Sequence, residues 1–156
     1  MTSPEPVAPT RPSNAADGAL FDAITTEHAT IYGYGIVSAH SIPEVNYLVS
    51  AAMAQHRSRR ESAIAMLADA GVEAPLPAAG YSLPMEVDAP TDAAKLAVTM
   101  EQDSATAWRA VIEQATDQSL RAFAVTALTD SAVTAARWRR VSGDPTITVA
   151  FPGGTE

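Results

Sequence analysis

Apolar residues recur at spacings of three and four along most of this chain, which is the pattern of helices that bury one face. The row of the first segment consists of Leu20, Ile24, Glu27, Ile31 and Tyr34. Asn14, a residue type that favours helix N-termini, precedes it. The pattern therefore predicts a first helix over residues 14–40.

A second helix is expected after almost no loop. Residues 41–44, Ser-Ile-Pro-Glu, have the form of a capping box with proline in the first turn. Gly71 is a suitable residue to end this helix. The inward row is written as Val45, Val49, Ala52, His56, Arg60, Ala63 and Leu67. The sequence thus predicts a helix over residues 43–70, antiparallel to the first.

Two further helices are expected between Asp92 and Ser142, a stretch without Gly or Pro. One helix of that length would far exceed the mean of about 11 to 12 residues. Thr116 and Asp117 are poor interior residues and good caps, so we expect a break there and helices over 91–115 and 117–141. Their inward rows are Ala97, Glu101, Ser104, Trp108 and Val111, then Leu120, Phe123, Ala127, Asp130, Thr134, Trp138 and Val141.

The connection over residues 71–90 loses the helical period and contains prolines 75, 77, 84 and 90. A compact domain seldom contains such a long loop without a purpose. A helix of about 28 residues is about 42 Å long, and about 20 extended residues can span at most about 66 to 72 Å. The connection can therefore return along the whole second helix, so that the third helix runs parallel to the second.

These elements predict an all-α protein, a four-helix bundle with a long crossover between helices two and three. Its 156 residues, 47% of them hydrophobic, suffice for one core without disulfides or structural zinc. We expect a flexible proline-rich tail over residues 1–13, the bundle over 14–141 and a C-terminal tail over 142–156. The C-terminal tail is short, β-prone and apolar, and could pack against the bundle or against a neighbouring subunit.

Composition excludes several classes of function. The absence of Cys excludes thiolate metal sites and thiol nucleophiles, and the net charge of -8 disfavours nucleic acid and anionic membranes as partners. No segment has the roughly 18 to 20 apolar residues of a membrane span, and the N-terminus has no signal-peptide pattern. The sequence contains no phosphate loop, dinucleotide motif or Ser-His-Asp arrangement. We therefore expect a cytoplasmic protein.

Four polar residues interrupt the apolar rows near the middle of the four helices: Glu27, His56, Glu101 and Asp130. Glu27 and His56 are equidistant in sequence from the junction of Ser41 and Ile42 between the first two helices, so an antiparallel hairpin places them face to face. Glu101 and Asp130 are equidistant from the break near Thr116. The two pairs are expected at one level of the bundle, where inward polar side chains can build a metal site.

Two long helical hairpins joined by a crossover, with these four residues on successive helices, resemble the ferritin-like superfamily. The resemblance covers residues 14–141 and is strongest to the rubrerythrin-type di-iron pattern. Among known families, the chain also resembles an actinobacterial ferritin-like family of unknown function. The superfamily pattern implies a lone Glu on helices one and three, which Glu27 and Glu101 match, and Glu-x-x-His on helices two and four. Here these motifs read Met53-Ala-Gln-His56 and Ala127-Leu-Thr-Asp130, so both Glu positions are lost.

Two interpretations remain open for these residues. They form either a buried hydrogen-bonded cluster, with Arg60 one turn from His56 as a further partner, or a mononuclear Fe, Mn or Zn site with Glu27, His56, Glu101 and Asp130 as ligands. The incomplete pattern favours a non-catalytic interaction or scaffold module with a degenerate di-iron site and no cofactor. The alternative is a mononuclear metal-binding protein or a metal-dependent oxidoreductase.

Self-association is expected for two reasons. Gly33 and Gly35 weaken the first helix but permit close approach by another helix, which a second subunit could supply. The apolar tail residues Ile147, Val149 and Phe151 offer more surface than a lone bundle needs. The sequence therefore predicts a homodimer.

Overall fold

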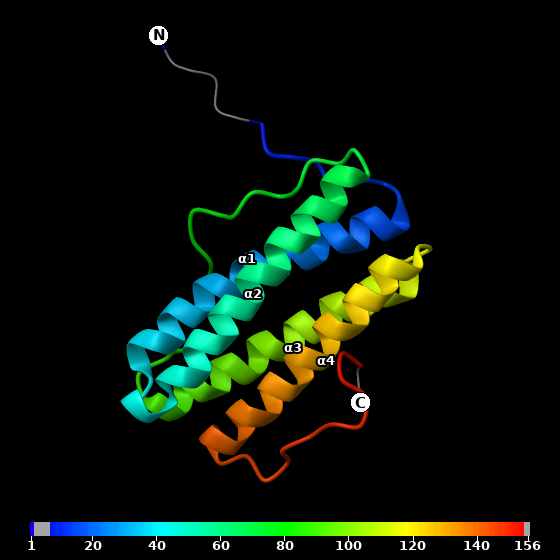
Figure 1. The fold of residues 1–156 in the computed structure, drawn as a ribbon. Helices are drawn as coiled ribbons and strands as arrows, with labels where there is room; N and C mark the ends of the chain where they lie inside the picture. Colours follow the sequence, from blue (N-terminus) through cyan, green and yellow to red (C-terminus); the bar gives the residue numbers. More distant parts are fainter. Residues whose placement is uncertain (2–6, 155–156) are drawn as a thin grey trace.

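Four α-helices form a bundle in the computed structural model, which describes residue 1 and residues 7–154 (Figure 1). A short 3-10 helix, η1 (Pro43–Val45), precedes the second α-helix. The α-helices are α1 (Ala15–His40), α2 (Asn46–Asp69), α3 (Pro90–Gln114) and α4 (Gln118–Ser142). The described residues include no strand. The predicted all-α four-helix bundle is thus confirmed.

Side-chain caps begin two of the α-helices, α1 and α4. The Asn14 carboxamide oxygen accepts a hydrogen bond from the Asp17 N–H at 3.1 Å, and Asp117 accepts one from the Leu120 N–H at 2.9 Å. The expected break before α4 is therefore confirmed. The expected capping box before α2 is wrong, because the Ser41 hydroxyl donates to the Val37 carbonyl at 2.7 Å and so closes α1 instead.

The crossover returns along the length of the bundle, as Figure 1 shows for the green segment that leads from α2 to the start of α3. Consequently α3 runs parallel to α2, while α1 and α4 run the other way. Helix α1 packs against α2 and α3, and α3 also packs against α4. Helices α2 and α4 make few contacts with each other, so this side of the bundle is the least closed.

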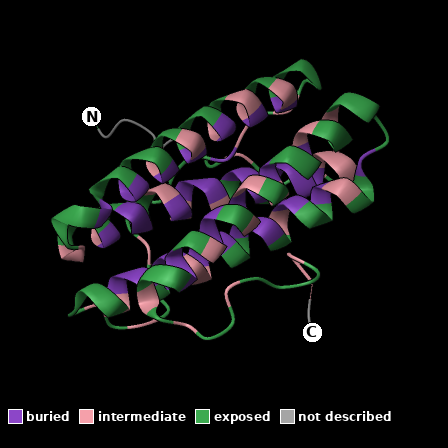
Figure 2. Cartoon of the chain, turned by 60° about the horizontal axis from the view of Figure 1, so that its bottom comes forward, coloured by how far each residue is buried: buried purple, intermediate pink, exposed green. Residues whose placement is uncertain are grey.

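Two apolar clusters fill the interior, and the inward faces of the helices are accordingly buried (Figure 2). One cluster gathers Tyr34, Leu48, Leu96 and Trp138 at one end of the bundle, and the other gathers Leu20, Ile24, Leu67 and Trp108 at the opposite end. Buried polar residues occupy the level between the two clusters: Glu27, His56, Arg59, Glu101, Ser104 and Ser131. The core therefore has an apolar, polar, apolar order along its length.

Gly33 allows α1 to pack closely against another helix of the same chain. A Cβ atom at this position would lie 2.1 Å from the Met100 sulfur atom, so the helix that approaches it closely is α3 of the same chain. A Cβ atom on Gly35 would have nothing within 4 Å. Gly33 therefore gives no support to a second subunit at this position.

At least one residue of each terminal segment contacts the bundle. Arg11 forms an ion pair with Asp22 of α1 at 2.9 Å. A Cβ atom on Gly153 would lie 2.6 Å from the Ala105 carbonyl oxygen, so the C-terminal tail packs on α3 of its own chain. Parts of the two predicted tails, residues 2–6 and 155–156, lie outside the described residues. No helix in the described part of the chain has the length and apolar character required to cross a membrane.

Candidate functional site

One histidine joins two glutamates at the centre of the bundle. His56 Nδ1 lies 2.6 Å from Glu27 Oε2, and His56 Nε2 lies 3.0 Å from Glu101 Oε1. All three side chains are at most 1% exposed. A carboxylate oxygen can only accept, so both ring nitrogens donate and His56 is an imidazolium cation.

The surroundings stabilise these charged forms. Burial acts to lower the pKa of His56, but the hydrogen bonds and negative charges of Glu101 and Glu27 outweigh it and raise the pKa to about 9. Burial acts to raise the pKa of Glu27, but the hydrogen bond and charge of His56, together with the charge of Arg59, hold it below its usual value. The charged forms of His56 and Glu27 therefore stabilise each other.

Arg59 supplies a second buried cation. Its Nη1 atom donates to Glu27 Oε1 at 3.2 Å and to Ser131 Oγ at 3.0 Å. Only 5% of the residue is exposed. Two carboxylates, Glu27 and Glu101, thus meet two cations in the interior, and a balance of this kind is what allows charges to remain buried.

Arg60 does not take the expected place beside His56. Its guanidinium pairs instead with the exposed Glu61 at 2.7 Å, while the preceding Arg59 points inward. Residues three and four positions away both lie one turn from His56, and consecutive residues differ by about 100° in direction. The sequence pattern therefore located the correct turn but not the correct arginine.

Asp130 lies at the edge of the cluster rather than in its centre. Its side chain is 40% exposed, and its Oδ2 atom is 4.0 Å from Arg59 Nη2. Ser131 occupies the interior position on α4 and is fully buried. The structure thus brings Glu27, His56 and Glu101 together and leaves Asp130 at the poorly closed side between α2 and α4.

Aromatic side chains add hydrogen bonds to both glutamates, through Oε1 of each. Trp108 Nε1 donates to Glu27 at 2.7 Å, and the Tyr34 hydroxyl donates to Glu101 at 2.5 Å and accepts from Trp138 Nε1 at 3.0 Å. Burial, followed by the charge of Glu101, raises the pKa of Tyr34 well above its usual value, so this hydroxyl remains a donor. Sequence reasoning assigned the three aromatics to the core but missed their polar contacts.

A sequence signal for these contacts exists. Tyr34 follows Glu27 by seven residues, and Trp108 follows Glu101 by seven residues. Each aromatic therefore lies two turns from the glutamate of its own helix and on the same face. In the antiparallel pair α1 and α3, each one bonds the glutamate of the opposite helix.

The donor set does not fit a metal ion. The His56 ring offers no free lone pair while both nitrogens donate to carboxylates. The described residues contain no group of three or more His, Asp or Glu side chains arranged to hold one. The oxygens of Glu27 accept from four side chains, those of His56, Arg59, Ser104 and Trp108. The cations that balance the carboxylates are thus the chain's own.

Comparison with known proteins places the chain in a family. The family described as "Domain of unknown function (DUF4439)" matches residues 19–156. The chain belongs to this family. A conserved hypothetical protein from Mycobacterium tuberculosis, solved by crystallography, is 60% identical, with 83% of this chain and 98% of that chain covered and a TM-score of 0.82. None of the curated proteins matches.

In this DUF4439 chain, apolar side chains occupy the two motif positions where the ferritin-like pattern implies glutamate. Met53 is half-buried and packs against one apolar cluster, and Ala127 is buried in the other. A hollow of about 200 Å³ beside Ala127, between α2 and α4, reaches Arg59 and Asp130. On this side, the residue of the centre that meets the hollow is therefore a cation, Arg59.

Proposed function

We propose that this chain is a non-catalytic, ferritin-like protein whose degenerate di-iron site has become a neutral charge cluster. The observation that carries the proposal is the bridge in which both ring nitrogens of His56 face a carboxylate oxygen. In the superfamily pattern, metal ions neutralise the inward carboxylates. Here His56 and Arg59 carry the equivalent positive charge, and Met53 and Ala127 contribute none of the missing ligands.

The cluster then serves stability and the specific packing of the helices. Each of its charges depends on the others, because a buried charge that loses its partner typically costs about 3 to 5 kcal/mol. A network with members on all four helices, Glu27, His56, Glu101 and Ser131 among them, also specifies how the helices align. This role requires no substrate and no resident cofactor.

We further propose that the protein acts as a homodimeric interaction or scaffold module. A groove of about 580 Å³ lies between α4 and the C-terminal tail, with Val133 and Ile147 in its lining and Arg137 and Arg140 beside them. The whole chain carries a net charge of -8. A second copy therefore offers both apolar surface for the groove and acidic partners for the two arginines.

A metal titration tests the first proposal. Protein purified without chelator or affinity-tag metal is analysed for bound elements and melted with and without micromolar Mn, Fe or Zn. A specific metal present at about 100 times its Kd would stabilise the fold by about 2.7 kcal/mol. We expect no stoichiometric metal and no such stabilisation.

The matched variants are His56→Ala and Glu101→Gln. A rise in melting temperature that requires both His56 and Glu101, with one metal per chain, would refute the charge-cluster proposal. It would establish the alternative, a mononuclear metal-binding protein or metal-dependent oxidoreductase, with Asp130 moved inward as a further ligand. Elemental analysis of the same variants separates specific binding from adventitious metal.

A further inference from the structure

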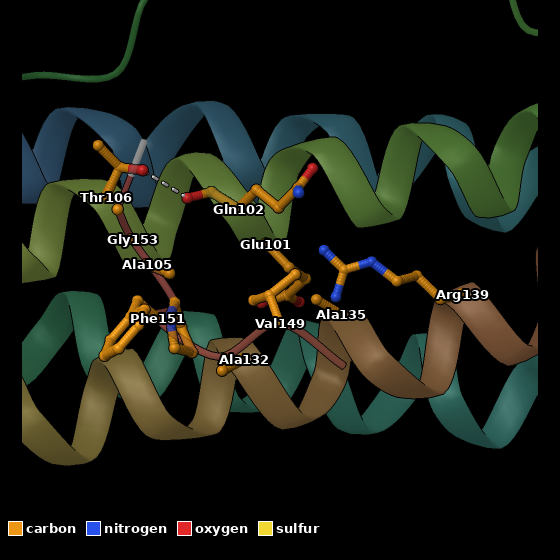
Figure 3. A pocket seen from close by; sticks show the side chains of 12 residues that line it. Glu101, Gln102, Ala105, Thr106, Ala132, Ala135, Arg139, Val149, Phe151 and Gly153 are labelled. Atoms are coloured by element: carbon orange, nitrogen blue, oxygen red, sulfur yellow. Dashed lines mark hydrogen bonds between the residues drawn. The ribbon is translucent and has the colours of Figure 1, made fainter. Parts of the chain in front are cut away.

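A second polar feature lies on the other side of Glu101. The C-terminal tail crosses α3 and α4 and forms one side of a cavity of about 160 Å³, with Val149 and Phe151 in its lining (Figure 3). Glu101, Ala135 and Arg139 line this cavity from the helices. Its volume is similar to that of a cavity of about 150 Å³ that holds one benzene molecule. The space therefore suits a small molecule rather than a single water.

Glu101 lines this cavity and has one carboxylate oxygen without a donor. Its Oε1 atom accepts from Tyr34 and His56, but its Oε2 atom is buried and has no hydrogen-bond partner among the described residues. A buried acceptor without a donor is costly, and for a carboxylate the cost is high. Figure 3 shows the Glu101 side chain running from α3 towards the tail at Val149. The structure thus leaves a strong acceptor at the wall of a cavity.

Arg139 is a buried cation that lacks a carboxylate partner within the described chain. Only 4% of the residue is exposed, and the one hydrogen bond of its side chain within the described chain is from Nη1 to the Ile147 carbonyl at 3.3 Å. Its guanidinium is turned towards the region of Glu101 and Val149 (Figure 3). No described carboxylate forms an ion pair with it, Glu101 included. A buried cation and a buried acceptor therefore line the same cavity without reaching each other.

We propose that this cavity is a binding site for a small zwitterionic amino acid. The ammonium group donates to Glu101 Oε2, and the carboxylate accepts from Arg139. The apolar part of the molecule packs against Val149, Phe151 and Ala135. Such a ligand pairs both buried groups and adds no net charge to the interior.

Other small molecules satisfy only half of the site. A simple anion pairs with Arg139 but faces the negative charge of Glu101, and a simple amine pairs with Glu101 but faces Arg139. Water can bond both groups, and a cavity of this size holds several water molecules. A site occupied by water alone is thus the competing outcome of the test.

Calorimetric titration and ligand-observed NMR of the full chain decide whether the cavity binds a zwitterion or holds water alone. The probes are glycine, β-alanine, 4-aminobutyrate and L-valine. The first three vary the distance between the two charged groups, and L-valine adds an apolar side chain. Butyrate and butylamine are the matched controls with one charge each. We expect saturable binding of at least one zwitterion, with butyrate and butylamine weaker by about tenfold or more, because each lacks one charge-assisted hydrogen bond.

Variants locate the site. Arg139→Met keeps an unbranched apolar stem but removes the guanidinium and its charge, and Ala135→Leu fills the cavity while both polar groups remain. Each should weaken zwitterion binding by about tenfold to a hundredfold, whereas Glu61→Gln on exposed α2 surface should not change it. Chemical denaturation verifies that each variant is folded. Absence of binding by every zwitterion, or binding that Arg139→Met and Ala135→Leu leave unchanged, would overturn the proposal.

Discussion

The charge of one residue, His56, determines whether the charges at the centre of this protein are balanced. With both ring nitrogens protonated, it bridges Glu27 and Glu101; with one proton removed, one of the two carboxylates faces a ring nitrogen that cannot donate. No other described contact of Glu101 brings a positive charge to it. Protonation of one imidazole is thus linked to the stability of the whole core.

The first prediction is therefore a loss of stability at alkaline pH. The pKa of His56 is about 9 in the folded chain and about 6.5 in an unfolded one. A raised folded pKa contributes stability that is complete below about pH 6.5 and is lost as pH rises through about 9, by roughly 3 kcal/mol in all. Urea unfolding from about pH 6 to pH 9.5, below the titration of unfolded tyrosines, measures this decline.

Two histidine variants identify the source of that slope. His56→Gln lowers stability throughout but should remove the alkaline decline, because the amide does not titrate. His28→Gln should keep the decline, since burial lowers the pKa of His28, and a lowered pKa does not cause a loss of stability as pH rises. A wild-type stability that is level from pH 6 to pH 9.5 would contradict an imidazolium at the centre.

A second prediction separates two adjacent arginines. Arg59→Met leaves Glu27 with one cation fewer in the interior and should cost about 3 to 5 kcal/mol of unfolding free energy. Arg60→Met breaks only the exposed pair with Glu61 and should cost less than about 1 kcal/mol. Urea denaturation of the two variants measures both values. Equal effects would mean that Arg59 is not part of the charge balance.

At the scale of helices, the sequence predicts well which helices form and in what order. It predicts less well which face of each helix turns inward. Caps such as Asn14 and Asp117 begin helices where expected, because their side chains bond nearby N–H groups and need no tertiary information. The inward position on α4 was placed one residue early, at Asp130 instead of Ser131. Spacings of three and four allow either choice, and only packing against α3 resolves it.

The packing of α1 on α3 gives a third prediction. Alanine in place of glycine in a helix gains about 1 kcal/mol in propensity, and Gly35→Ala should show this gain because a Cβ atom there meets nothing. Gly33→Ala places its Cβ atom on the Met100 sulfur, and such overpacking typically costs about 1 to 3 kcal/mol. Thermal and urea unfolding should show that Gly35→Ala is more stable than Gly33→Ala by about 1 to 3 kcal/mol, which is the cost of overpacking. Met100→Ala should relieve the strain in Gly33→Ala, and no relief would contradict the assigned contact.

On the scale of the whole molecule, two sides of the bundle differ. The side between α2 and α4 is poorly packed and reaches the cluster at Arg59 and Asp130. The side formed by α3 and α4 is crossed by the tail, which covers the Glu101 cavity and forms one wall of the groove on α4. Val149 and Pro152 line both spaces. The tail therefore joins the proposed ligand site to the proposed dimer surface.

The last prediction concerns the homodimer, whose case rests on the groove because Gly33 faces its own chain. Multi-angle light scattering at tens of micromolar should report two chains per particle. Val133→Glu puts a charge into the groove and should shift the protein towards monomer, since an unpaired buried charge opposes association. Val125→Glu is the matched control, because Val125 is 47% exposed and Val133 46%, yet only Val133 lines the groove. Deletion of residues 144–156 should also weaken association. A wild-type monomer at this concentration, or equal effects of the two valine variants, would remove the groove as the interface.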